Sequence, residues 1–184
     1  MKKSLIIIGV ILIIVVFALF GYYNKFVTDN EGVDGQWAQV ETQYQRRFDL
    51  IPNLVESVKG VMAQEQEVFG MIAEARTKYA GAETADEKAG AATEVESALG
   101  RLLVVMENYP QLKSAENVNT LMAQLEGTEN RISVERGRYN ATVKDYNVMT
   151  KRFPANIIAG MFGFGERNYF EAAEGSEVAP SVQF

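Results

Sequence analysis

The sequence predicts an all-α protein in which an N-terminal transmembrane helix precedes an elongated antiparallel bundle of three long helices and a short C-terminal helix or strap. Two observations support this prediction. The segment from Leu5 to Tyr23 carries no charged side chain, and most of the remaining chain repeats apolar residues at alternating steps of three and four. That spacing is typical of helices that bury one face, and a strand cannot maintain it.

Composition and charge exclude several classes of function. The 184 residues include no cysteine and no histidine, which rules out disulfides, thiolate or imidazole catalysis and the usual zinc sites. No nucleotide-binding or nucleophile motif occurs either. Because 24 acidic residues outnumber 18 basic ones and the basic residues do not cluster, we expect no nucleic-acid partner. We therefore predict no enzyme activity, no cofactor and no metal site.

Residues 1–23 are expected to form a cytoplasmic N-terminus and a transmembrane anchor that contacts the lipid bilayer. The apolar segment from Leu5 to Tyr23 would span about 28 Å at the helical rise, close to the roughly 30 Å of a bilayer's hydrocarbon core. A cleaved signal peptide is the alternative, but bulky Phe20 stands where a small residue should precede the cleavage site. We therefore expect a permanent signal anchor with Tyr22 and Tyr23 at the membrane interface.

Basic residues beside the anchor predict its orientation. Lys2 and Lys3 lie on the N-terminal side, whereas only Lys25 lies close on the other side, where acidic residues follow it. The positive-inside rule then places the N-terminus in the cytoplasm and the domain that follows the anchor outside.

The first bundle helix is predicted to run without interruption from Trp37 to Tyr79, after a juxtamembrane hinge at residues 24–36 that contains two glycines. Because proline removes a backbone hydrogen bond, we expect Pro52 to kink this helix. Eleven of its thirteen seam positions are apolar or aromatic, the seam being Trp37, Val40, Tyr44, Phe48, Ile51, Val55, Val58, Met62, Glu65, Phe69, Ile72, Arg76 and Tyr79.

Two further helices complete the predicted bundle. The second begins after Thr84 or Asp86, either of which can cap it, and stops at Pro110. The third begins at Ser114 and ends before Pro154. Their predicted buried faces consist of Ala92, Val95, Leu99, Leu102, Met106 and Tyr109 in the second helix, and of Val118, Leu121, Met122, Leu125, Ile132, Tyr139, Val143, Tyr146 and Phe153 in the third.

The predicted bundle domain, residues 37–170, ends in an apolar and glycine-rich stretch, and residues 171–184 are expected to form an irregular tail. The stretch from 156 to 165 either packs on the bundle as a short helix or strap, or leaves Met161, Phe162 and Phe164 exposed. An exposed apolar patch usually contacts a partner or a membrane. These three residues are therefore candidates for partner binding.

Two charged residues interrupt the seam of the first bundle helix, and a buried charge requires a partner. When the predicted helix ends are aligned, Glu65 falls opposite Arg101, and Arg76 falls near Glu135 or Glu129. We therefore predict two interhelical ion pairs, Glu65 with Arg101 and Arg76 with Glu135 or Glu129. Their expected role is to fix the register of the helices, as buried polar groups do in coiled coils. A functional polar pocket inside the bundle is the alternative.

Several short motifs stand out along the chain, namely Tyr23-Asn24, residues 37–40 (WAQV), 46–55 (RRFDLIPNLV), 107–113 (ENYPQLK) and 128–132 (TENRI), Tyr139-Asn140, Tyr146-Asn147, Phe153-Pro154, Gly163-Phe164 and Tyr169-Phe170-Glu171. In combination they resemble the LemA family of bacterial membrane proteins. The resemblance covers the whole chain. It implies one N-terminal membrane helix, an elongated antiparallel helical domain and a place in the bacterial cell envelope, but no catalytic residues.

The sequence thus leaves two hypotheses of function. The first is a non-enzymatic scaffold or interaction protein, anchored in the bacterial inner membrane, whose bundle faces a membrane-protein partner or copies of itself and forms an oligomer. The predicted orientation places this domain in the periplasm, although some relatives are thought to have the reverse topology. The second hypothesis is a helical bundle that binds an apolar ligand between helices rich in Met, Phe and Tyr.

Overall fold

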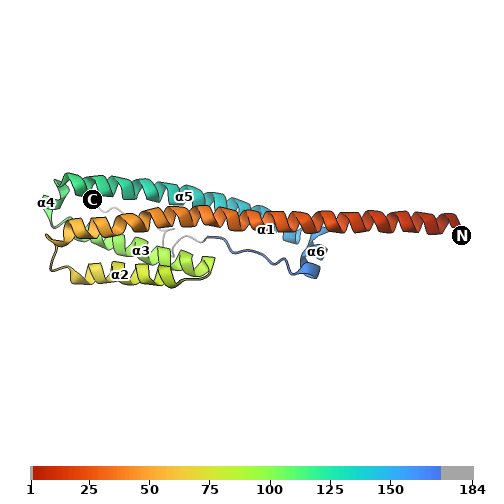
Figure 1. Ribbon diagram of the computed structural model, residues 1–184, viewed down its shortest axis with the longest axis horizontal. Helices are drawn as coiled ribbons and strands as arrows, with labels where there is room; N and C mark the ends of the chain where they lie inside the picture. The colour runs from red at the N-terminus through yellow and green to blue at the C-terminus, as the bar shows by residue number, and fades with distance from the viewer. Residues whose placement is uncertain (1, 171–184) are drawn as a thin grey trace, which may run out of the picture. The chain divides into compact units, whose positions relative to one another are not determined.

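The computed structural model describes residues 2–170, and this part of the chain contains helices and no strand (Figure 1). The all-α prediction with an N-terminal apolar helix is therefore confirmed. The tail predicted for 171–184 lies outside the described residues. The helices are α1 (Lys2–Lys59), α2 (Gln66–Gly81), α3 (Ala85–Met106), α4 (Pro110–Lys113), α5 (Glu116–Lys151) and α6 (Ala155–Phe162).

The described chain divides into two compact units. Unit 1 contains residues 2–38 and 137–169, and unit 2 contains residues 39–136 and 170. The helices α1 and α5 each contribute to both units. The segment 24–36, which the sequence predicts to be a hinge, is helical and belongs to α1.

The prediction of one uninterrupted helix from Trp37 to Tyr79 is wrong. In unit 2 the helix α1 passes through Pro52 but ends at Lys59, and α2 begins at Gln66. In Figure 1 the chain turns between them, and α2 returns beside α3. Ring contacts confirm the reversal, because the centroids of Phe48 and Tyr79 lie 4.3 Å apart. In one straight helix these residues would be separated by about 46 Å.

The reversal occurs because it buries the apolar face of α2. Gly60 follows the last residue of α1, and Val58 accepts backbone hydrogen bonds from Val61 at 3.0 Å and Met62 at 2.9 Å. Met62 is fully buried under this turn. Beyond the turn the buried residues of α2 are Val68, Ile72 and Ala75, so Val68 replaces the predicted Phe69 on the packed face. Unit 2 is consequently built on four long helical segments, from α1, α2, α3 and α5.

The start of α3 agrees with the sequence. The hydroxyl of Thr84 accepts a hydrogen bond from the Glu87 N–H at 3.2 Å, and the Glu87 carboxylate accepts from the Thr84 N–H at 3.1 Å. This reciprocal capping box satisfies donors that the helix itself cannot satisfy. Hydrogen bonds from the backbone N–H groups of Glu83 and Thr84 hold the pKa of Glu87 below its usual value. The predicted face of Ala92, Val95, Leu99, Leu102 and Met106 is buried.

The third predicted helix is largely correct but its ends differ. Pro110 begins a separate short helix, α4, since proline suits the first turn of a helix. Ser114 follows α4 and its hydroxyl donates to the Gln111 carbonyl at 3.0 Å instead of capping α5. Phe153 lies beyond the end of α5 and is 76% exposed, so its predicted burial is wrong. The rest of the predicted face is buried at Val118, Leu125, Ile132, Tyr139, Val143 and Tyr146 and half-buried at Leu121 and Met122.

The reversal between α1 and α2 predicts an energetic coupling between Phe48 and Tyr79. In a double-mutant cycle of Phe48→Leu and Tyr79→Leu, we expect a coupling of about 0.5–1.5 kcal/mol, the usual range for an aromatic pair. Urea unfolding of the full chain in detergent micelles, followed by circular dichroism, measures it. Additive effects of the two substitutions would contradict the reversal, because residues in one straight helix would lie too far apart to interact.

Candidate interaction sites

The N-terminal part of α1 in unit 1 carries an apolar surface that the described chain does not cover. Its most apolar stretch is long enough to cross a membrane and none of that stretch is buried, which distinguishes it from the core helix of a soluble protein. The side chains of residues 6–20 are exposed on all faces of the helix. A hydrocarbon environment would satisfy such a surface, and a location of this chain at a membrane is therefore supported.

The short helix α6 forms the second apolar element of unit 1. Ala155, Ile158 and Ala159 are buried on one side of it. Gly163 ends the helix with φ of 76°, a left-handed conformation that glycine adopts without steric cost. Through this turn the Phe164 N–H donates to the Ala159 carbonyl at 2.9 Å. The chain is thereby directed back toward α1.

The three apolar residues that the sequence singled out behave differently. Phe164 is half-buried and stacks on the fully buried Phe26, with ring centroids 5.0 Å apart. Met161 and Phe162 are 67% and 53% exposed, and Phe162 contacts the edge of Tyr23 at a centroid distance of 4.9 Å. Both alternatives predicted for the stretch 156–165 are therefore found in part. Phe164 packs within unit 1, whereas Met161 and Phe162 remain exposed and can contact a partner or a membrane.

Asn147 fixes the strap that follows α6, a role that the sequence did not reveal. Its buried amide donates to the Arg167 carbonyl at 2.8 Å and accepts from the Arg167 N–H at 2.8 Å. The strap, residues 163–169, is also held by an ion pair of Arg167 with Asp34 and one of Lys151 with Glu166. The available signal was the Tyr-Asn pair repeated seven residues apart, which predicts a shared helix face but not a strap.

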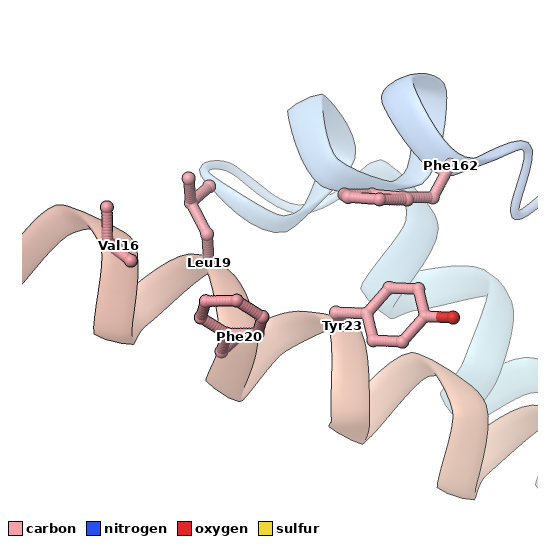
Figure 2. A pocket seen from close by; sticks show the side chains of 5 residues that line it. All are labelled: Val16, Leu19, Phe20, Tyr23 and Phe162. Atoms are coloured by element: carbon pink, nitrogen blue, oxygen red, sulfur yellow. The ribbon is translucent and has the colours of Figure 1, made fainter.

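An apolar pocket of about 340 Å³ opens between α1 and α6 in unit 1 (Figure 2). Figure 2 shows Phe162 of α6 facing Tyr23 across this pocket, with the aliphatic and aromatic side chains of α1 along its other wall. The lining residues are Val16, Leu19, Phe20, Tyr23 and Phe162. Apart from the Tyr23 hydroxyl these side chains are hydrocarbon, so the pocket suits an apolar occupant.

Unit 2 contains a larger groove, of about 510 Å³, between α1, α3 and α5. Arg47 forms an ion pair with Glu129 at this groove, and its side chain is only 10% exposed. Among the described residues its Nε has no hydrogen-bond acceptor. The groove is lined by Arg47, Leu54, Leu99, Leu103, Asn119, Met122, Ala123, Leu125, Glu126 and Glu129. The groove therefore combines an apolar wall with the ion pair of Arg47 and Glu129, while the unpaired Nε itself is shielded from solvent.

The structure does not form the first predicted ion pair. Glu65 lies in the turn before α2 and accepts a hydrogen bond from the Tyr109 hydroxyl at 2.9 Å. Arg101 instead lies 3.8 Å from Glu67, and both side chains are largely exposed. The reason is the chain reversal, which moves Glu65 out of a helix seam and into the turn.

The second predicted pair is not formed either. Arg76 is exposed on α2 and Glu135 is half-buried on α5, and no ion pair joins them in the described part of the chain. Glu129, the alternative partner, pairs with Arg47. Because α2 runs opposite to the assumed direction, the alignment that placed Arg76 near these carboxylates does not apply.

A polar network on other residues joins the helices of unit 2. Arg136 of α5 donates to the Tyr44 hydroxyl of α1 from Nε at 3.0 Å, and to the Glu96 carboxylate of α3 at 3.2 Å. Its guanidinium also lies 4.3 Å from the centroid of the Phe170 ring. Burial raises the pKa of Tyr44, although Arg136 opposes this shift. Around this network no described group of three carboxylates is placed to hold a metal ion.

The structure thus defines a helical protein with one candidate membrane span, in which polar clusters connect helices and apolar surfaces remain open. Residues 36–184 match the LemA family, and the chain belongs to this family. It is similar to the magnetosome proteins MamQ 1 and MamQ 2 of Paramagnetospirillum magneticum, with 29% identity over an alignment of 195 positions that covers 91% of this chain and 72% of each relative. Magnetosome protein MamQ of Magnetospirillum gryphiswaldense is 29% identical over an alignment of 174 positions, which covers 80% of this chain and 64% of that protein.

The network around Arg136 predicts a contrast between two arginines. Arg136→Met should lower the free energy of unfolding by about 1.5–3 kcal/mol, because it removes charge-assisted hydrogen bonds to Tyr44 and Glu96. Arg101→Met, which removes an exposed pair, should change it by less than about 0.5 kcal/mol. Urea unfolding of both variants in micelles measures the difference. Equal losses would show that Arg136 does not hold the helices together.

Proposed function

We propose that this chain is a non-enzymatic interaction protein, anchored in the bacterial inner membrane, that presents unit 2 to a membrane-protein partner or to copies of itself. The observation that carries this proposal is the groove beside Arg47. The polar clusters of unit 2 support a structural role for its charged residues, since each connects one helix to another. The groove, in contrast, leaves an apolar surface of unit 2 open.

The buried guanidinium of Arg47 favours an occupant with a hydrogen-bond acceptor. A buried donor without an acceptor costs roughly 1–3 kcal/mol. Because Nε is shielded from solvent in the described chain, an incoming oxygen atom reaches it only when the Arg47 side chain shifts toward the groove. Glu129 already neutralises the charge of Arg47, so the oxygen atom that approaches Nε would belong to a neutral carbonyl or amide group. Such oxygens occur in the side chains and at the helix ends of proteins.

The lining of the groove resembles a protein interface. Leucine and methionine side chains form its apolar part, while Asn119, Glu126 and Glu129 provide polar groups. An apolar centre with a polar rim is the usual organisation of interfaces. Grooves between helices also receive the apolar face of a partner helix. A helix of a membrane-protein partner or of a second copy would satisfy both features.

An apolar small ligand is the second candidate occupant of the groove, because the volume of the groove is suitable for a small molecule. About 510 Å³ lies within the range of roughly 300–1,000 Å³ that is usual for small-molecule sites. A ligand with a hydrocarbon chain and one oxygen acceptor would match Leu54, Leu99 and Arg47. The two candidates differ in the mass of whatever is attached to the groove after crosslinking.

Photocrosslinking from the groove tests the proposed function. With p-benzoylphenylalanine at Leu103, which lines the groove and is 39% exposed, irradiation of cells should give one discrete adduct. The same group at Val104, 66% exposed on the same helix and not lining the groove, is the matched control and should give none. Mass spectrometry then identifies a partner protein, a dimer of this chain or a small ligand.

The role of Arg47 is tested in the same experiment. Arg47→Lys keeps the charge beside Glu129 but removes Nε, so adduct formation from position 103 should fall several-fold. Circular dichroism should show that the fold is unchanged. No adduct at Leu103, or equal adducts at Leu103 and Val104, would refute the groove as the binding site. A small-ligand adduct would replace the first candidate by the second.

We further propose that the N-terminus is cytoplasmic and unit 2 lies in the periplasm, as the lysines beside the anchor favour. The natural chain has no cysteine, so a single Val104→Cys substitution gives a unique label on an exposed side chain. In intact cells this residue should react with a membrane-impermeant maleimide. Reaction only after the cells are lysed would establish the reverse orientation.

A further inference from the structure

The exposed side of α6 and the residue before it form a continuous apolar surface in unit 1. We call this the α6 surface, and it consists of Phe153, Ile157, Met161 and Phe162. Ile157 is 52% exposed, and the other three are exposed by more than half as well. The helix itself carries no charged residue, and Ala155, Ile158 and Ala159 already use its opposite side for packing. The α6 surface is therefore not needed to hold unit 1 together.

The α6 surface adjoins the apolar span of α1. Phe162 contacts Tyr23, and together they line the pocket whose other wall is Val16, Leu19 and Phe20 (Figure 2). From Val16 to Tyr23 the helix rises by about 10 Å. This distance matches the depth of roughly 5–10 Å to which interfacial helices enter a bilayer. If Tyr23 lies at the interface, Phe162 lies at the boundary between headgroups and acyl chains.

Charged residues flank α6 at both ends, as an interfacial helix requires. Lys151 and Arg152 precede it and are exposed, and Glu166 and Arg167 follow its terminal glycine turn. Lys151 and Arg167 already pair with Glu166 and Asp34. The exposed side chain of Arg152 can reach a lipid phosphate while its apolar stem remains in the membrane. The strap fixes this arrangement, because Asn147 binds the backbone of Arg167 on both sides.

We propose that the α6 surface lies in the membrane interface, with its apolar side chains among the acyl chains and one lipid chain in the pocket between Phe162 and α1. The occupant is the lipid bilayer. This inference rests on the proposed membrane anchor. It assigns the exposed residues Met161 and Phe162 to lipid, and leaves the groove of unit 2 for the partner.

Site-directed spin labelling of the purified full chain in vesicles of phosphatidylethanolamine and phosphatidylglycerol tests this assignment. Because the natural chain lacks cysteine, single substitutions Ile157→Cys and Met161→Cys place one nitroxide each on the α6 surface. Leu12→Cys, within the span, is the reference for the membrane interior. Val104→Cys on α3, whose exposure of 66% matches the 67% of Met161, is the control for water.

Membrane depth is obtained from the relative accessibility of each nitroxide to oxygen, which concentrates in lipid, and to a water-soluble nickel complex. Labels at Ile157 and Met161 should show an oxygen-to-nickel ratio several-fold above that of Val104 and approaching that of Leu12. A ratio equal to that of Val104 would overturn the proposal, and so would low accessibility to both reagents, which indicates coverage by protein. If the label at position 12 is itself accessible to the nickel complex, the result refutes the proposed membrane anchor rather than the placement of the α6 surface.

Discussion

Burial of one stripe of α1 is the constraint on which both units depend. In unit 1 the fully buried Phe26 and Val33 belong to this stripe, and Phe26 receives the rings of Tyr146 and Phe164. In unit 2 the stripe continues through Val40, Tyr44, Ile51, Leu54 and Val58. Rings from two other helices reach this stripe, Tyr79 of α2 on Phe48 and Tyr146 of α5 on Phe26, while α2 lies beside α3. The fold is therefore organised by a spacing of three and four residues within a single helix.

The distribution of apolar residues around the helix changes along α1. Before Tyr22 apolar residues occupy every face, and none of the span is covered by protein. From Phe26 onward most large apolar residues lie on one buried side, and most charged residues lie on the exposed side. A helix that is apolar all round requires lipid or a large core, whereas a striped helix requires other helices. The boundary between these two requirements falls at the tyrosines Tyr22 and Tyr23, beside α6.

The charged residues of this protein differ in how strongly they are buried, and this difference determines how much each contributes to stability. Lys78 with Glu94, and Arg101 with Glu67, are exposed pairs and contribute little to stability. Arg136 and Arg47 are much less exposed, although their carboxylate partners Glu96 and Glu129 remain partly exposed. Loss of Arg136 would also leave the hydroxyl of the buried Tyr44 without this donor. Arg136 has acceptors on two other helices, whereas Arg47 retains one donor without an acceptor. Both arginines therefore join helices, since Arg47 of α1 pairs with Glu129 of α5, and Arg47 differs in that it lines the groove.

The sequence predicted most of the buried faces but not their connections. Periodicity located the stripes on α1, α3 and α5, and Thr84 marked a helix start, because spacing and capping are local properties. A seam that continues through a reversal looks the same as a seam in one long helix, since both helices face the same core. In the sequence only Gly60 marked the turn. The ion pairs predicted for Glu65 and Arg76 are not formed, because α2 runs in the opposite direction to the one assumed. The contacts of Arg47, Arg136 and Asn147 join residues distant in sequence and had no local signal.

The properties of α6 show why part of the candidate site required the structure. Its sequence, with isoleucine, methionine and phenylalanine but no charge, suits a buried helix as well as a membrane surface. The left-handed turn at Gly163 and the clamp at Asn147 determine which side is buried, and both depend on the strap that returns along α5. Because Ala155, Ile158 and Ala159 are small or already covered, packing within unit 1 occupies the narrow side of the helix. The bulky side chains then face outward at the level of the span, where hydrocarbon rather than water is the environment that matches them.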